Sequence, residues 1–223
     1  MRTRIKICGI TRLEDAQAAA ALGADAIGLV FYPKSPRAVG LEQARCLARA
    51  VAPWMSVVGL FVNAERAQVL ETAQAVGLSH IQLHGDEDPA ACRDLGRPVV
   101  KALRVSAATT ADGLITLVNQ FRDDASLLFD ADSSGFGGSG MAFDWQILKA
   151  VGPHLPTNWV LSGGLESGTV SQAIATLGPP AVDVSSGVER LLDGELVKGV
   201  KDLDRMKAFV HAVARANGPR SNE

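Results

Sequence analysis

The sequence predicts a single-domain α/β protein, a (βα)8 TIM barrel with eight parallel strands, on the strength of three observations. Short β-branched runs alternate with longer stretches rich in Ala, Leu, Arg and Glu, the pattern of repeated strand–helix units around a parallel sheet. Eight such units follow one another in 223 residues without a linker or a change in composition. Barrels of this class commonly fill about 200 to 250 residues as one domain. We therefore expect a barrel over residues 1–215 and a disordered tail over 216–223.

The first four expected strands cover residues 4–8, 25–30, 55–61 and 79–83. The first is an apolar run that stops at Gly9, and Thr11-Arg12-Leu13-Glu14 after it has the form of a capping box that opens the first helix. The second expected strand follows Gly23, and the fourth follows Gly77. Glycine accepts the left-handed conformation that ends a helix, so each of these glycines marks the end of the helix before the strand.

The last four expected strands cover residues 98–103, 126–130, 158–162 and 181–185. The sixth is an apolar run closed by Asp130, and the eighth follows Gly178. A helical stretch is expected after each of the eight strands. Residues 131–143 form a long glycine-rich segment, which fits either a loop that closes over a ligand or an ordinary surface loop.

Composition excludes several classes of partner. Hydrophobic residues make up 47% of the chain, charged residues 21%, and the net charge is -2, with no basic stretch that resembles a nucleic-acid footprint. No apolar run approaches the roughly 18 to 20 residues of a membrane span, and the N-terminus lacks the apolar segment of a secretion signal. Cys8, Cys46 and Cys92 are far apart, so neither a disulfide framework nor a zinc site is indicated. We expect a cytoplasmic protein.

Two motifs that suggest cofactors are misplaced. Residues 135–140 satisfy G-x-G-x-x-G, but they do not turn directly from a strand into a helix, as a dinucleotide site requires. His80 and His84 have the spacing of a metal pair on a helix, yet Ile81 and Leu83 between them indicate a strand. We therefore expect no metal and no cofactor, and we place His84 at a strand end, where it lines the pocket.

Polar residues gather where the strands end, which is where active sites of these barrels lie. Gly163 and Gly164 follow the seventh strand, and Ser185 and Ser186 follow the eighth. Phosphate commonly binds after these two strands. A turn without ligand is the alternative for each pair alone. Together they predict a small phosphorylated substrate.

Cys8 and Asp130 are the candidate base and acid. Both end a strand, so both are held rigidly at the mouth. Burial favours the protonated form of a carboxyl group, which suits a general acid, and a nearby positive charge would favour the thiolate of Cys8. A buried core thiol and a loop-capping carboxylate are the alternatives. Asp132 is a second candidate acid.

Motifs in this order along nearly the whole chain resemble the phosphoribosylanthranilate isomerase family of tryptophan biosynthesis. They are Lys6-Ile7-Cys8-Gly9-Ile10-Thr11, Phe31-Tyr32-Pro33-Lys34-Ser35-Pro36-Arg37, Gly59-Leu60-Phe61-Val62-Asn63, Gln82-Leu83-His84-Gly85, Gly137-Gly138-Ser139-Gly140 with Phe143-Asp144-Trp145, Leu161-Ser162-Gly163-Gly164-Leu165 and Asp183-Val184-Ser185-Ser186-Gly187-Val188-Glu189.

The resemblance implies an Amadori rearrangement of N-(5'-phosphoribosyl)anthranilate to 1-(2-carboxyphenylamino)-1-deoxyribulose 5-phosphate. It implies that Cys8 is the general base, Asp130 the general acid, and Arg37 the partner of the anthranilate carboxylate. His84 and Asp183 are counted among the substrate-binding residues with the two phosphate turns. Phe129 departs from the family, which usually has an aliphatic residue before the acid.

Two other functions stay open. A sister isomerase of histidine biosynthesis would use the same chemistry, but that family carries aspartate in place of Cys8 and needs a second phosphate turn near strands three and four. The other is a phosphoribosyl-binding barrel without catalysis. The oligomeric state stays open as well.

Overall fold

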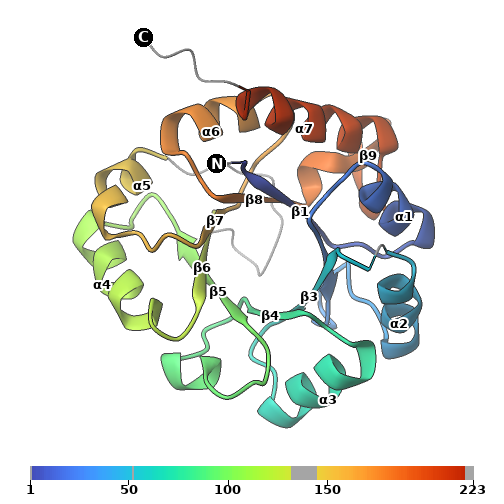
Figure 1. Cartoon of the computed structure of the whole chain (residues 1–223), viewed down its shortest axis with the longest axis horizontal. Helices are drawn as coiled ribbons and strands as arrows, with labels where there is room; N and C mark the ends of the chain where they lie inside the picture. Colours follow the sequence, from blue (N-terminus) through green and yellow to red (C-terminus); the bar gives the residue numbers. More distant parts are fainter. Residues whose placement is uncertain (1, 52, 132–144, 219–223) are drawn as a thin grey trace.

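The computed structural model describes residues 2–51, 53–131 and 145–218, and within them eight parallel strands close into a barrel (Figure 1). The expected fold class is confirmed. The strands are β1 (Arg4–Cys8), β2 (Ala26–Val30), β3 (Ser56–Phe61), β4 (His80–Leu83), β5 (Val99–Val105), β6 (Ser126–Ala131), β7 (Trp159–Leu161) and β8 (Ala181–Val184). Each differs from its expected range by two residues or fewer at either end.

Helices surround the strands. They are α1 (Leu13–Ala21), α2 (Leu41–Arg49), α3 (Arg66–Val76), α4 (Ala111–Phe121), α5 (Gln146–Ala150), α6 (Val170–Leu177) and α7 (Leu203–Ala216), with 3-10 turns η1 (Pro89–Cys92), η2 (Gly152–His154) and η3 (Ser186–Val188). Residues 219–223 of the expected tail lie outside the described residues. Among the helices that are described, none is long and apolar enough to cross a membrane.

Strand register sets which side chains face the barrel interior. β1 lies between β8 and β2, with Lys6 opposite Asp183 and Cys8 opposite Gly28. Because successive side chains of a strand point to opposite faces, Lys6 and Cys8 share one face of β1, and Ile5 and Ile7 share the other.

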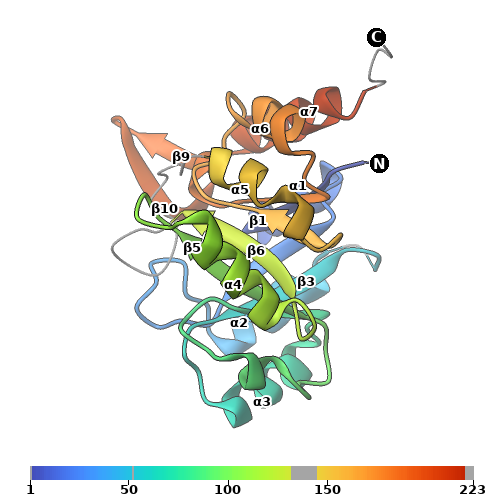
Figure 2. The same ribbon diagram turned by 90° about the vertical axis from the view of Figure 1, so that its left-hand side faces the viewer.

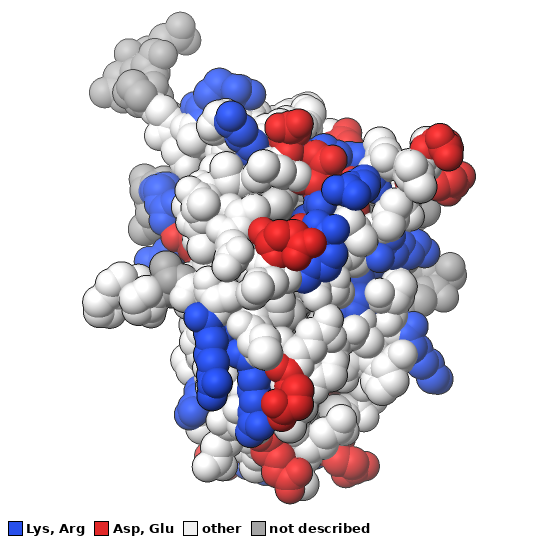
Figure 3. Space-filling model, turned by 90° about the vertical axis from the view of Figure 1, so that its right-hand side faces the viewer, with Lys and Arg blue, Asp and Glu red and all other residues white. Residues whose placement is uncertain are grey.

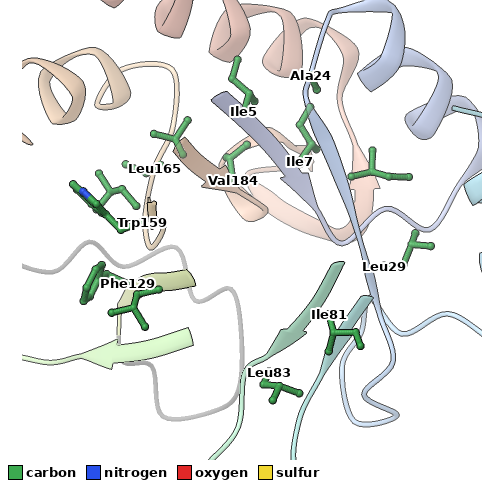
Figure 4. Packing of buried hydrophobic residues seen from close by; sticks show 14 of the residues in the cluster. Ile5, Ile7, Ala24, Leu29, Ile81, Leu83, Phe129, Trp159, Leu165 and Val184 are labelled. Carbon is green, nitrogen blue, oxygen red and sulfur yellow. The ribbon is translucent and has the colours of Figure 1, made fainter. Parts of the chain in front are cut away.

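The main hydrophobic core is the layer of strand and helix side chains to which Ile5 and Ile7 belong. Figure 4 shows members of this layer, including Ile7, Leu29 and Phe129. Phe129 is completely buried, and its ring meets Trp159 edge to face at 5.8 Å. Since Asp130 follows Phe129 in the strand, it takes the opposite face. The departure from the family at Phe129 thus lies in the outer layer, away from the acid.

Two local expectations were wrong. After β4 the chain forms only the turn η1 in place of an α-helix: Asp88 accepts from Ala91 N at 2.9 Å, and Arg93 is already extended. Thr11 does not cap α1. Its hydroxyl donates to Gly199 O, and the N-cap residue, Arg12, has no capping side-chain bond.

An antiparallel hairpin, β9 (Glu189–Leu192) and β10 (Glu195–Lys201), was not expected. It is inserted between η3 and α7, and Figure 2 shows it projecting at one end of the barrel. The second strand of the hairpin, β10, ends at Lys201 and places it beside Ser185, which follows β8. The surface seen in Figure 3 carries basic and acidic side chains side by side, so that face has no single-sign patch.

Candidate active site

Cys8 is the last residue of β1 and is 5% exposed. It packs against Val30, Leu60 and Val62. A Cβ added to Gly28, on the neighbouring strand, would lie 2.7 Å from Cys8 Sγ, so glycine is needed for the thiol to fit there. Burial raises the pKa of Cys8, while the charges of Lys6 and Lys201 act in the opposite direction. The site therefore combines an apolar wall with nearby cations.

Lys6 and Asp183 form an enclosed ion pair on the inner face of β1 and β8. Lys6 Nζ lies 2.9 Å from Asp183 Oδ1, and both side chains are buried. Burial by itself would lower the pKa of Lys6, but the attraction of Asp183 and Cys8 outweighs burial and leaves that pKa above its ordinary value. Lys6 thus carries a positive charge beside the candidate base.

Asp130 lies on the inner face of β6 and is joined to His84. Asp130 Oδ2 lies 3.1 Å from His84 Nε2, and His84 Nδ1 lies 2.8 Å from Gln82 Nε2. With the Gln82 amide nitrogen donating to Nδ1, the neutral ring carries its proton on Nε2 and donates to Asp130. Both Gln82 and His84 come from β4 and the residue after it, so one strand orients the candidate acid.

Arg37 is held by a protein carboxylate, which the sequence did not indicate. Arg37 Nε and Nη2 each donate to Glu189 at 2.7 Å, and both side chains are almost fully buried. Lys201 Nζ lies 3.2 Å from Glu189 Oε1 and donates to Ser185 O at 3.0 Å. A guanidinium has five N–H donors, so donors of Arg37 remain for a ligand.

This cluster has more positive than negative charge. Burial acts to raise the pKa of Glu189, but Arg37 and Lys201 outweigh it and hold that pKa below its ordinary value. Burial lowers the pKa of Lys201, and Glu189 opposes the shift. Glu189 balances only one of the two positive charges of Arg37 and Lys201, and an anionic ligand would balance the other.

The two expected phosphate turns pack directly against each other. A Cβ on Gly187 would come within 2.0 Å of Leu165 O, and Gly163 and Gly164 adopt positive φ angles of 84° and 64°. A cavity of about 390 Å³ lies beside them, lined by Gly164, Leu165, Glu166, Ser186, Gly187, Leu191, Gly194, Leu196 and Arg205. The glycines thus allow two backbone turns to meet at one edge of the mouth.

Gly163 also contacts the candidate acid. A Cβ at this position would lie 3.1 Å from Asp130 Oδ1 and 2.4 Å from Ala131 N. One glycine therefore serves both the phosphate turn and the close approach to Asp130. Asp132 and nearly all of the segment 131–143 lie outside the described residues.

The closed barrel brings the strand ends with Cys8, His84, Asp130 and Asp183 to one mouth. Lys6, Gln82, Glu189 and Lys201 were missed by the sequence reasoning. The sequence held a signal for Lys6, since it is a charged residue inside an apolar strand, two positions before Cys8 and therefore on the same face. Within the described ranges, no group of three or more His, Cys, Asp or Glu could hold a metal ion.

Comparisons with known proteins agree with one another. Residues 5–212 match the family model of N-(5'-phosphoribosyl)anthranilate (PRA) isomerase. The N-(5'-phosphoribosyl)anthranilate isomerase of Pseudomonas syringae pv. syringae is 49% identical over 211 residues, which is 94% of this chain and 97% of the relative.

Solved structures give the same result. Phosphoribosyl anthranilate isomerase from Thermotoga maritima superimposes with a TM-score of 0.85 at 39% identity, covering 96% of this chain and 99% of that one. A phosphoribosyl anthranilate isomerase in complex with reduced 1-(o-carboxyphenylamino)-1-deoxyribulose 5-phosphate has a TM-score of 0.82 at 37% identity, with the same coverage.

Proposed function

Since this chain belongs to the N-(5'-phosphoribosyl)anthranilate isomerase family and is an isomerase of tryptophan biosynthesis, we propose that Cys8 and Asp130 are its general base and general acid. The family match decides against the two alternatives that the sequence left open. What remains to be assigned is the role of each residue at the mouth.

Asp130 begins the reaction by giving a proton to the ribose ring oxygen. The bond from that oxygen to C1' breaks, the oxygen leaves as a hydroxyl, and the anthranilate nitrogen forms a double bond to C1'. The cationic nitrogen makes the proton on C2' acidic. Cys8 removes this proton, the freed electron pair forms the C1'–C2' double bond of an enolamine, and the C1'=N bond becomes single as its electron pair returns to nitrogen. Cys8 then loses the proton to solvent and Asp130 regains one, which restores both groups. The enolamine then tautomerises to the ketoamine by moving a proton from the C2' hydroxyl to C1'.

The observation that carries this assignment is the pair of reactive groups on strands that are not neighbours. Cys8 ends β1 and Asp130 lies near the end of β6, so they approach a ligand in the mouth from different sides. A positioned acid or base typically contributes about 100-fold to 10,000-fold. His84 supports the acid because its bond to Oδ2 fixes the carboxyl orientation.

Arg37 and the two turns hold the ends of the substrate. Arg37 recognises the anthranilate carboxylate with the donors that Glu189 leaves free. The phosphate binds to the turns at Gly163, Gly164, Ser185 and Ser186, where phosphate commonly binds in these barrels. Asp183 does not hold the substrate directly; it acts through its ion pair with Lys6. A solved relative is in complex with a compound that carries both a carboxyl group and a phosphate, which supports a substrate with these two ends.

The test follows the loss of substrate fluorescence with freshly generated N-(5'-phosphoribosyl)anthranilate. Cys8→Ser and Asp130→Asn should each lose most of the turnover, while Cys46→Ser, which alters an exposed thiol on α2, should not. If either site variant turns over at the parental rate, that residue has no place in the mechanism.

A further inference from the structure

Cys8 sits against an apolar wall, and an apolar wall alone disfavours the thiolate that a base requires. We infer that Lys6 is the positioning residue that makes Cys8 usable as a base, by keeping a fixed positive charge beside its sulfur. This inference rests on the proposed role of Cys8.

Geometry places the lysine chain next to the thiol. Lys6 and Cys8 are two residues apart in β1, so their side chains leave the strand on the same face. Both cover Gly28 on β2: a Cβ there would lie 3.1 Å from Lys6 Cε and 2.7 Å from Cys8 Sγ. The end of the lysine chain therefore lies beside the sulfur, and only glycine at this position leaves room for both.

The Lys6 ammonium has donors to spare. Nζ is enclosed, and its ion-pair partner is Asp183 Oδ1 at 2.9 Å. Within the described part of the chain, no hydrogen bond of Nζ meets strict geometry, although Nζ lies close enough to Asp183 and to the Cys8 thiol to interact with both. An enclosed ammonium whose hydrogen bonds are incomplete costs free energy, and a catalytic role is one of the explanations for such a group in a native protein. A thiolate at Cys8 would supply an acceptor.

The other charges around Cys8 are few. Asp183 on β8 is negative and Lys201 on β10 is positive, whereas β2 contributes Gly28 and Val30, and the Tyr32 side chain packs against the same cluster. Among these charges, Lys6 lowers the pKa of Cys8 most, and Asp183 raises it. Asp183 also keeps Lys6 protonated. The pair thus supplies a permanent cation next to the sulfur.

Alkylation measures this effect without substrate. Intact protein in a Cys46→Ser background is treated with iodoacetamide across a pH series, and the Cys8 peptide is quantified separately from that of Cys92. An opposite charge within a few ångströms favours the ionised form by about one pKa unit or more, so Lys6→Met should slow alkylation of Cys8 at neutral pH by about 10-fold or more. Lys6→Arg should keep most of the rate. Asp183→Asn should raise it.

A double variant separates this role from a structural one. Lys6→Met leaves Asp183 buried without a partner, which can unfold the protein, while Lys6→Met with Asp183→Asn removes both charges. If the pair serves only the stability of the barrel, the double variant is alkylated as fast as Asp183→Asn. Under the inference it regains stability but is alkylated more slowly, by about 10-fold or more, than Asp183→Asn, which keeps the Lys6 charge.

The inference is overturned if Lys6→Met is alkylated at the parental rate across the series, or, where Lys6→Met does not fold, if the double variant is alkylated as fast as Asp183→Asn. That result leaves the proposed base intact as long as Cys8→Ser is inactive. The reverse result is an active Cys8→Ser variant together with alkylation of Cys8 that still depends on Lys6 in proteins that keep the thiol. It removes Cys8 from the mechanism and leaves the charge effect standing.

Discussion

Replacing Glu189 by glutamine, which removes its charge and keeps its shape, should destabilise the protein strongly. Glu189 is fully buried and accepts two bonds from Arg37, one from Lys201 and one from Gly199 N. A glutamine amide offers one oxygen and one NH2 group, so in either orientation an Arg37 donor faces a donor. Two buried cations are then left without their anion.

Removing one partner of a buried pair costs about 3–5 kcal/mol. For a domain of this size that lowers Tm by roughly 6 to 20 °C. Urea unfolding at neutral pH, monitored by fluorescence, measures the free energy of unfolding. KM for the substrate should rise too, because Arg37 loses the carboxylate that orients it. Glu195→Gln, at an exposed position of β10, is the matched control and should change neither quantity.

The pH dependence adds a second test. The pKa of Glu189 in the folded protein is below its ordinary value of 4.5. The contribution of its charge to stability is therefore complete above pH 4.5 and is lost as the pH falls through the lower, folded-state value. The gap between parent and Glu189→Gln should shrink in acid. A variant as stable as the parent at neutral pH, or a gap that stays constant into acid, would refute the reasoning.

Three further results are expected. Cys8→Ser should fold and bind the reduced product analogue but lose about 100-fold to 10,000-fold in kcat; near-parental kcat contradicts the base role. Asp130→Asn should abolish turnover while Asp132→Asn changes rates modestly, as steady-state assays would show; the opposite order assigns the acid to Asp132. Arg37→Ala should weaken binding of carboxylate-bearing analogues by about 1.5–3 kcal/mol, measured by calorimetry, and equal binding by parent and variant excludes Arg37 as the carboxylate partner.

The barrel strands were predictable because each is a short apolar run with its own local boundary. The hairpin also had a local signal that was overlooked: Asp193-Gly194 between two strand-like runs is a typical two-residue turn, and both residues have positive φ, 52° and 86°. The helix expected after β4 failed for a different reason. Its composition suits a helix, but Asp94 takes a left-handed conformation and the chain turns away early.

The reactive groups at the strand ends were also predictable, because the topology of a barrel places the carboxyl ends of all its strands at one mouth. Their partners were not. Lys6 meets Asp183 because β1 and β8 close the barrel in one particular register. Arg37 meets Glu189 because of the hairpin that was missed. Such contacts join distant parts of the chain, and no local pattern encodes them.

The pairing of β1 with β8 has a consequence during synthesis. A ribosome delivers β1 first and β8 last of the barrel strands, at about 5–20 residues per second, so roughly 10 to 35 seconds separate the two. Until β8 emerges, β1 has only one neighbour and Lys6 has no Asp183. Contacts between such distant segments also form slowly. A nascent chain from which β8 has not yet emerged therefore lacks both the closed barrel and the Lys6–Asp183 pair beside Cys8. We expect activity to arise only when the barrel is completed.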